Sequence, residues 1–177
     1  MRTLTTGGGN TALGKQTLSA LDTGTYNVAL GNEALLSADG AENNNVAIGA
    51  GAMGNVNNDS TEKNIAIGRN TMVGGTGELD RNVAIGHNAM DGTGTVAGQQ
   101  NIFIGDSAGG GTWTTAASNS NVAIGATAMS AALNGALGNT AVGHDTLKAL
   151  TTGDYNVAIG HSAGDAITTA GYNVLIG

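Results

Sequence analysis

The chain carries a short pattern of apolar and polar positions that recurs along nearly its whole length. A five-residue phrase (Asn, a β-branched residue, usually Ala, then Ile, Leu or Val, then Gly) occurs ten times, and successive copies begin 17 to 20 residues apart. The second and fourth positions share one face of an extended segment, because side chains alternate along a strand. β-branched side chains favour strands, and the Gly that follows ends the strand with a turn. The pattern predicts one short strand per repeat.

One repeat cannot bury its own apolar side chains, but a stack of repeats can. We therefore expect an all-β fold, a parallel β-solenoid or β-roll with about ten coils of 17–20 residues. The Ala or Thr and the Leu, Met or Gly at the eighth and ninth positions are expected to begin a second short strand. Residues 1–9 are expected to form an initial segment or partial coil, and residues 10–177 a single repeat domain that is part of a longer fibre.

The first position of the phrase is Asn in every copy. In a parallel stack these residues fall in register, so that their side-chain amides can hydrogen-bond from coil to coil. The sequence therefore predicts a structural ladder made of Asn10, Asn27, Asn45, Asn64, Asn82, Asn101, Asn121, Asn139, Asn156 and Asn173.

The third position lies on the strand face opposite the Val and Ile residues. We expect Val and Ile to point into the coil and the third residue to point outward. Small outward residues let another backbone approach closely. This predicts packing between copies of the chain through Ala29, Ala47, Ala66, Ala84, Phe103, Ala123, Ala141, Ala158 and Leu175.

The phrase NVAIG followed by two residues and Ala, as in residues 82–90 (NVAIGHNAM) and 156–164 (NVAIGHSAG), resembles the head repeats of YadA-like trimeric autotransporter adhesins. The resemblance implies left-handed β-rolls assembled as an intertwined or side-by-side homotrimer. The repeat is longer here, which makes it more similar to the shafts of bacteriophage tail fibres and related bacterial surface fibres. The resemblance covers essentially the whole chain and implies an extracellular attachment fibre on a virion or bacterial cell surface.

Composition and charge narrow the range of partners. The 177 residues include 31 Gly, no Pro, no Cys, one Trp and one Phe, which suits a thin structure better than a globule. The net charge is −7 and the Lys and Arg residues do not cluster, so we expect no nucleic-acid partner. No apolar run reaches membrane-spanning length, so we expect no membrane insertion of this segment.

One stretch imitates a nucleotide-binding loop. Residues 9–15 have the spacing G-x-x-x-x-G-K, but Gln16 stands where a P-loop has Ser or Thr, and no helical pattern follows. Lys15 occupies a variable position of the repeat. Catalytic triads and paired buried carboxylates are also lacking, so we expect neither enzymatic activity nor a cofactor.

Three histidines, His87, His144 and His161, occupy the same variable position just after the Gly. His144 and His161 belong to consecutive coils and should stack about 5 Å apart. They are candidate metal ligands if that position faces a threefold axis; otherwise they are exposed polar residues. The acidic loops 57–62 and 77–80 lack the glycine-aspartate nonapeptide of calcium β-rolls, which favours a solvated acidic surface.

The longest insertion, residues 106–120, contains the only Trp of the chain. Trp113 is a candidate for contact with a glycan or a cell-surface receptor. The alternative is that its ring covers the base of its own loop or packs on a neighbouring chain.

Two other functions are compatible with the repeat. One is an end-to-end self-assembling β-solenoid filament. The other is an ice- or ligand-binding solenoid, which requires a regular Thr array. At the eighth position Thr occurs only as Thr17, Thr71 and Thr146, so that array is broken.

Overall fold

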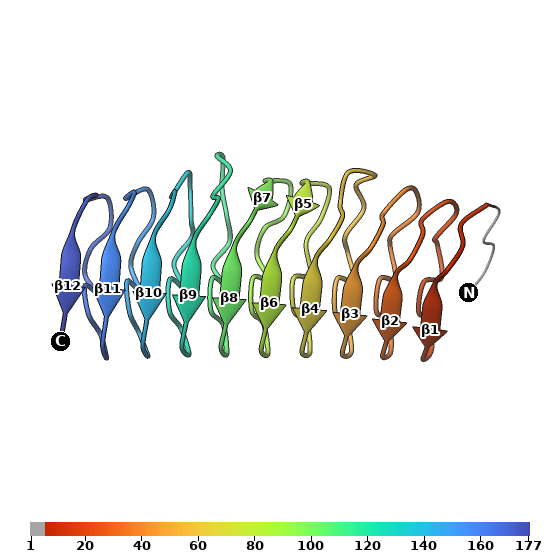
Figure 1. Cartoon of the computed structure of the whole chain (residues 1–177), viewed down its shortest axis with the longest axis horizontal. Coiled ribbons are helices and arrows are strands. Elements are labelled where there is room, and N and C mark those ends of the chain that lie inside the picture. Colours follow the sequence, from red (N-terminus) through yellow and green to blue (C-terminus); the bar gives the residue numbers. More distant parts are fainter. Residues whose placement is uncertain (1–5) are drawn as a thin grey trace.

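In the computed structural model, residues 6–177 form one continuous stack of coils (Figure 1). Ten three-residue strands, one per repeat, form a single parallel sheet in chain order. They are β1 (Thr11–Leu13), β2 (Val28–Leu30), β3 (Val46–Ile48), β4 (Ile65–Ile67), β6 (Val83–Ile85), β8 (Ile102–Ile104), β9 (Val122–Ile124), β10 (Thr140–Val142), β11 (Val157–Ile159) and β12 (Val174–Ile176). The described part of the chain contains no helix. The predicted all-β parallel solenoid is confirmed, and its ten strands enclose about nine turns.

A second, much smaller sheet lies on the return side of the coils, where β5 (Leu79–Asp80) pairs in parallel with β7 (Gly98–Gln99). The prediction of a second strand at the eighth and ninth positions is wrong, because those residues form a turn. In the coil of β6, Asn88 and Met90 have φ values of 53° and 52°, which bend the chain instead of extending it. Of the predicted initial segment 1–9, residues 1–5 lie outside the described residues.

The two faces of the main sheet are the reverse of those predicted. Ala66 is completely buried, whereas its strand neighbour Ile65 is 38% exposed. The predicted interchain surface therefore lies inside the coil. Its members in the core are Ala29, Ala47, Ala66, Ala84, Phe103, Ala123, Ala141 and Ala158, with Leu175 partly buried against it.

The narrow width of the coil explains this reversal. The ninth position adds a long side chain to the interior, as Met72 and Met90 do, and these side chains are fully buried. The return segment adds another apolar side chain, such as Val56 or Leu79. The remaining space on the inner side of the strand holds a methyl group, so Ala fits there and Ile does not.

The first-position Asn residues form a ladder inside the stack. The backbone N–H and the Nδ2 of Asn82 both donate to Oδ1 of Asn64, at 2.9 and 3.1 Å. The Nδ2 of Asn82 also donates to the carbonyl oxygen of Gly98 at 2.7 Å, which ties the strand to the return segment of its own coil. Each first-position Asn from Asn27 to Asn173 donates its backbone N–H to the Oδ1 of the first-position Asn in the preceding coil. The ladder therefore fastens every coil to its neighbours and closes individual coils.

The Gly at the end of each strand marks the closest approach of one coil to the next. Gly86 has a φ of 138°, a conformation that other residues rarely adopt. A Cβ atom at Gly86 would also overlap the carbonyl oxygen of Gly105 in the following coil. Both constraints apply to the strand-ending Gly of the first nine copies of the phrase, from Gly14 to Gly160, which accounts for Gly at this position.

Candidate functional site

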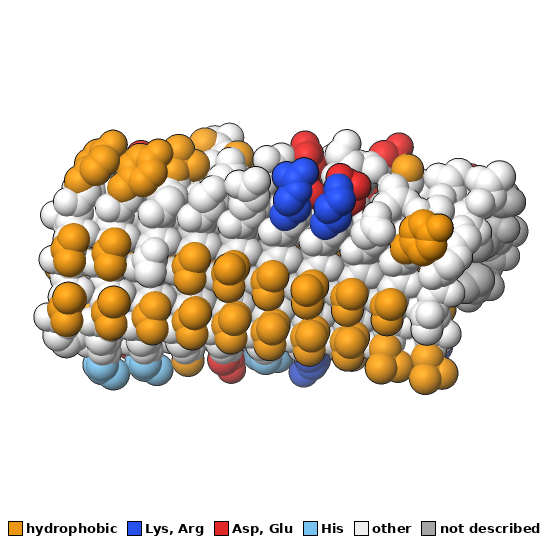
Figure 2. All heavy atoms as spheres, in the orientation of Figure 1, with side chains coloured by type: hydrophobic (Ala, Val, Ile, Leu, Met, Phe, Trp, Pro, Cys, Tyr) orange, Lys and Arg blue, Asp and Glu red, His pale blue; other side chains and the backbone are white. Residues whose placement is uncertain are grey.

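The outer face of the ten-stranded sheet carries two lines of mostly aliphatic side chains, here called the aliphatic rows, of which the first is interrupted by Thr (Figure 2). They consist of the second and fourth residues of each phrase, which alternate with the buried third residue. The first row is Thr11, Val28, Val46, Ile65, Val83, Ile102, Val122, Thr140, Val157 and Val174. The second row is Leu13, Leu30, Ile48, Ile67, Ile85, Ile104, Ile124, Val142, Ile159 and Ile176.

Sheet geometry sets the dimensions of this face. Successive residues within a row pair directly across neighbouring strands, as Ile67 pairs with Ile85. At about 4.8 Å per strand, nine spacings give a face about 43 Å long. Neither row contains a charged residue. Large contiguous apolar surfaces on soluble proteins mark sites of association, so this face is the strongest candidate for an interface.

The candidate histidines lie on the turns that follow the strands. The rings of His144 and His161 stack with centroids 5.2 Å apart and planes 7° from parallel. His87 lies in a distant coil, with Nδ1 3.6 Å from Oδ1 of Asp106. The single chain therefore brings two of the three histidines together and leaves the third elsewhere.

Trp113 is not placed for recognition of a ligand, because it is only 3% exposed. Its ring meets that of Phe103 edge-on, with centroids 6.2 Å apart and an interplanar angle of 84°. Its Nε1 donates a hydrogen bond of 3.2 Å to the carbonyl oxygen of Gly109. The structure therefore supports the alternative in which Trp113 covers the base of its own loop.

The eighth-position Thr residues form no outward array. Thr17, Thr71 and Thr146 are buried, and each hydroxyl donates to a Gly carbonyl oxygen of the next coil at 2.5–2.7 Å. These side chains therefore stabilise the stack, and their burial prevents them from contacting a ligand at the surface. Lys15, from the P-loop-like stretch, is exposed on the turn after β1, and no helix begins there.

Across residues 6–177, a single group of three or more potential metal ligands is present, made of Asp39, Glu42 and Asp59. The loop that contains Asp59 was recognisable as acidic from the sequence, but its two partners were missed. The signal available was a pair of acidic residues three apart, followed by Asp59 in the loop one coil later. No described helix is long and apolar enough to span a bilayer.

Comparison of the chain with protein-family models, curated proteins and solved structures found no match.

Proposed function

We propose that this chain is a structural segment, a shaft or head, of a homotrimeric extracellular fibre that serves attachment of a virion or a bacterial cell. The observation that carries the proposal is the pair of aliphatic rows, which expose mostly Val, Ile and Leu side chains along the length of the sheet. Leu30, Ile124 and Ile159, away from the ends of the stack, are 39–43% exposed. Such a face gains stability when it is covered by another apolar surface.

The regular spacing of the rows indicates what kind of surface covers them. Side chains protrude once per coil, at about 4.8 Å, so a partner interdigitates well only if its own side chains have the same spacing. Another copy of this chain has that spacing over the same length. A second copy in parallel orientation is therefore the partner whose geometry fits best.

The number of copies follows from the resemblance to trimeric adhesin heads and phage fibres. Three chains around an axis parallel to the stack would turn their aliphatic rows toward that axis. The alanines predicted from the sequence as the contact surface play no part in this arrangement, because they fill the interior of each coil.

A stack of this kind suits a rigid spacer. Parallel pairing runs without interruption from β1 to β12, and the buried Asn ladder joins every coil to the next. In the proposed fibre, recognition of a receptor or glycan belongs to the loops or to a distal tip, and the coils supply reach and stiffness.

Light scattering coupled to size-exclusion chromatography tests this proposal. The purified chain should have the mass of a trimer. The double variant Ile67→Asp/Ile85→Asp places charges at the centre of one row and should be monomeric with unchanged circular dichroism. Thr95→Asp introduces one such charge on an exposed loop and should leave the trimer intact. A wild-type chain that is monomeric at micromolar concentration would contradict the proposal.

Electron microscopy tests the alternative of end-to-end filaments. Finite rods of uniform length are expected for the trimer, whereas filaments of indefinite length and single-chain width would favour the alternative. A measurement of thermal hysteresis tests ice binding, and we expect none.

A further inference from the structure

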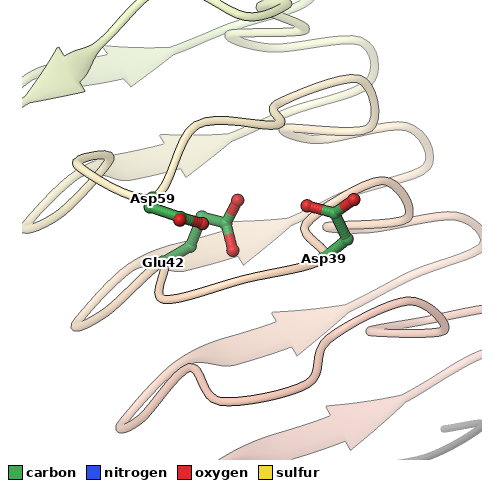
Figure 3. Close-up of side chains that lie close together, drawn as sticks. All are labelled: Asp39, Glu42 and Asp59. Atoms are coloured by element: carbon green, nitrogen blue, oxygen red, sulfur yellow. The ribbon is translucent and has the colours of Figure 1, made fainter.

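Three carboxylates lie close together where the return loops of two successive coils lie side by side. Asp39 and Glu42 lie in the loop between β2 and β3, and Asp59 lies in the loop between β3 and β4. One carboxylate oxygen of each residue lies within 4.8 Å of the others. Figure 3 shows the carboxylates of Glu42 and Asp59 close together, with that of Asp39 facing them.

Backbone groups hold two of these carboxylates in place. The Gly40 N–H donates to Oε2 of Glu42 at 3.1 Å, and the Ala41 N–H donates to Oδ1 of Asp59 at 3.2 Å. The Asp59 carboxylate also packs directly on Gly40, in the space that a side chain there would fill. The acidic groups are thus drawn together by the fold in spite of their mutual repulsion.

Glu42 supplies an independent observation that points to a ligand at this cluster. Its side chain is completely buried, and its Oε1 atom has no hydrogen-bond partner. None of the ion pairs formed within residues 6–177 involves Asp39, Glu42 or Asp59. A buried carboxylate oxygen without a partner is costly, and two neighbouring carboxylates add to that cost.

We propose that Asp39, Glu42 and Asp59 bind a divalent cation of the calcium class, with Oε1 of Glu42 as the buried ligand. Calcium prefers carboxylate oxygens at about 2.3–2.6 Å, so ligand oxygens on opposite sides of one ion are about 4.8 Å apart. The spread of the three carboxylates fits a sphere of that size. Asp39 and Asp59 are exposed, so water can complete the coordination from the outer side.

The consequence is a cross-link between coils. The ion would connect the return loop after β2 with that after β3, on the side of the coil opposite the main sheet. Burial raises the pKa of Glu42, so that a proton and the cation compete for the same carboxylate.

Isothermal titration of the metal-free chain with CaCl₂ and with MgCl₂ at pH 7 tests the site. We expect one Ca²⁺ per chain, with Mg²⁺ binding more weakly. Glu42→Gln and Asp39→Asn should each weaken Ca²⁺ binding by roughly tenfold or more, since affinity follows the charge of the ligand set. Asp165→Asn removes one exposed charge far from the cluster and should leave the titration unchanged.

Two outcomes would overturn the proposal: no binding of Ca²⁺ at millimolar concentration, or an equal loss of binding in Asp165→Asn. Asp39 is exposed, so Asp39→Asn keeps the test decisive even if Glu42→Gln fails to fold. The proposed cation site lies within one chain and does not require the trimer. The monomeric Ile67→Asp/Ile85→Asp variant should bind Ca²⁺ as the wild type does.

Discussion

The ring of Phe103 fills the space that a side chain at Gly109 would occupy. A Cβ atom built on Gly109 would lie 2.8 Å from three atoms of that ring. Elsewhere in the stack the third position is usually Ala and the ninth is usually Leu or Met, as in the pair Ala84 and Met90. The coil of β8 has exchanged the two sizes, and the volume of its core is preserved.

This exchange predicts strong coupling between the two positions. Phe103→Ala should lower the free energy of unfolding by about 3–5 kcal/mol, because it leaves a cavity beside Trp113. Gly109→Met should also destabilise the chain, because its side chain overlaps the ring. The double variant restores the arrangement of the other coils and should recover most of the loss, since Met90 adopts a left-handed φ of 52° and Gly109 one of 63°. Chemical denaturation, monitored by circular dichroism, gives the free energies of unfolding of the wild type, the two single variants and the double variant. Purely additive losses in the double variant would contradict the prediction.

The Asn ladder should not tolerate a substitution that keeps the shape of an Asn side chain but removes its N–H donors. Asn82→Asp loses the bonds from Nδ2 to Asn64 and Gly98 and places a charge in the interior. We expect a loss of roughly 3 kcal/mol or more in the free energy of unfolding at pH 7. Asn88→Asp makes the same chemical change on a turn outside the ladder and should cost little. Similar losses for the two variants would argue against a ladder that stabilises the fold.

Gly86 and Gly94 differ in backbone conformation and in what an added side chain would contact. Gly86→Ala forces a Cβ against the carbonyl oxygen of Gly105 and should destabilise or prevent stacking at that level. Gly94 also has a positive φ, of 56°, but nothing lies within 4 Å of an added Cβ. Gly94→Ala should therefore cost only about 1 kcal/mol. Thermal melts of the two variants provide the comparison, and equal costs would contradict a special requirement for Gly at position 86.

Glu42 should make the metal-free chain less stable as the pH rises. Burial is the main cause that raises the pKa of Glu42 above its usual 4.5. Hydrogen bonds from the backbone N–H groups of Glu42 and Gly40 oppose this rise, and the charges of Asp59 and Asp39 add smaller increases to the pKa. The folded chain therefore favours the neutral carboxyl. That stabilisation is complete below the unfolded pKa and is lost as the pH rises through the higher folded pKa.

In EDTA, Glu42→Gln should match the wild type near pH 4 and exceed its stability at pH 7. Urea denaturation across this range measures the difference, with Asp165→Asn as the control for loss of one negative charge. A difference between Glu42→Gln and the wild type that stays constant with pH would count against the raised pKa.

The sequence was sufficient to predict the ten strands of the main sheet, their parallel stacking and the positions of the ladder residues. These features depend on the spacing of identical residues, above all the Asn and the Gly that delimit each phrase. The inner and outer faces were assigned in reverse. Alternation shows that Val and Ile share a face, but it does not show which face is inside. Phe103 with Gly109, and Leu175 beside Gly164, were the internal clues that the third and ninth positions compete for one space.

The repeat pattern did not predict the acidic cluster, for a different reason. Its residues come from loops of unequal length, outside the repeated phrase, so no periodicity aligns them. The burial of Glu42 depends on how the loop that contains Asp59 folds over Gly40. That contact is decided by the three-dimensional path of both loops.

Each Asn of the ladder bonds to the ladder Asn of the neighbouring coils and to the return segment of its own coil, so the ladder itself sets no limit on the number of coils. Duplication or deletion of one whole coil keeps the Asn-to-Asn contact at the new junction, and it changes the length of the stack by about 4.8 Å. The coil is thus a unit of length, and a gene that gains or loses copies of it changes the length of the solenoid in discrete steps.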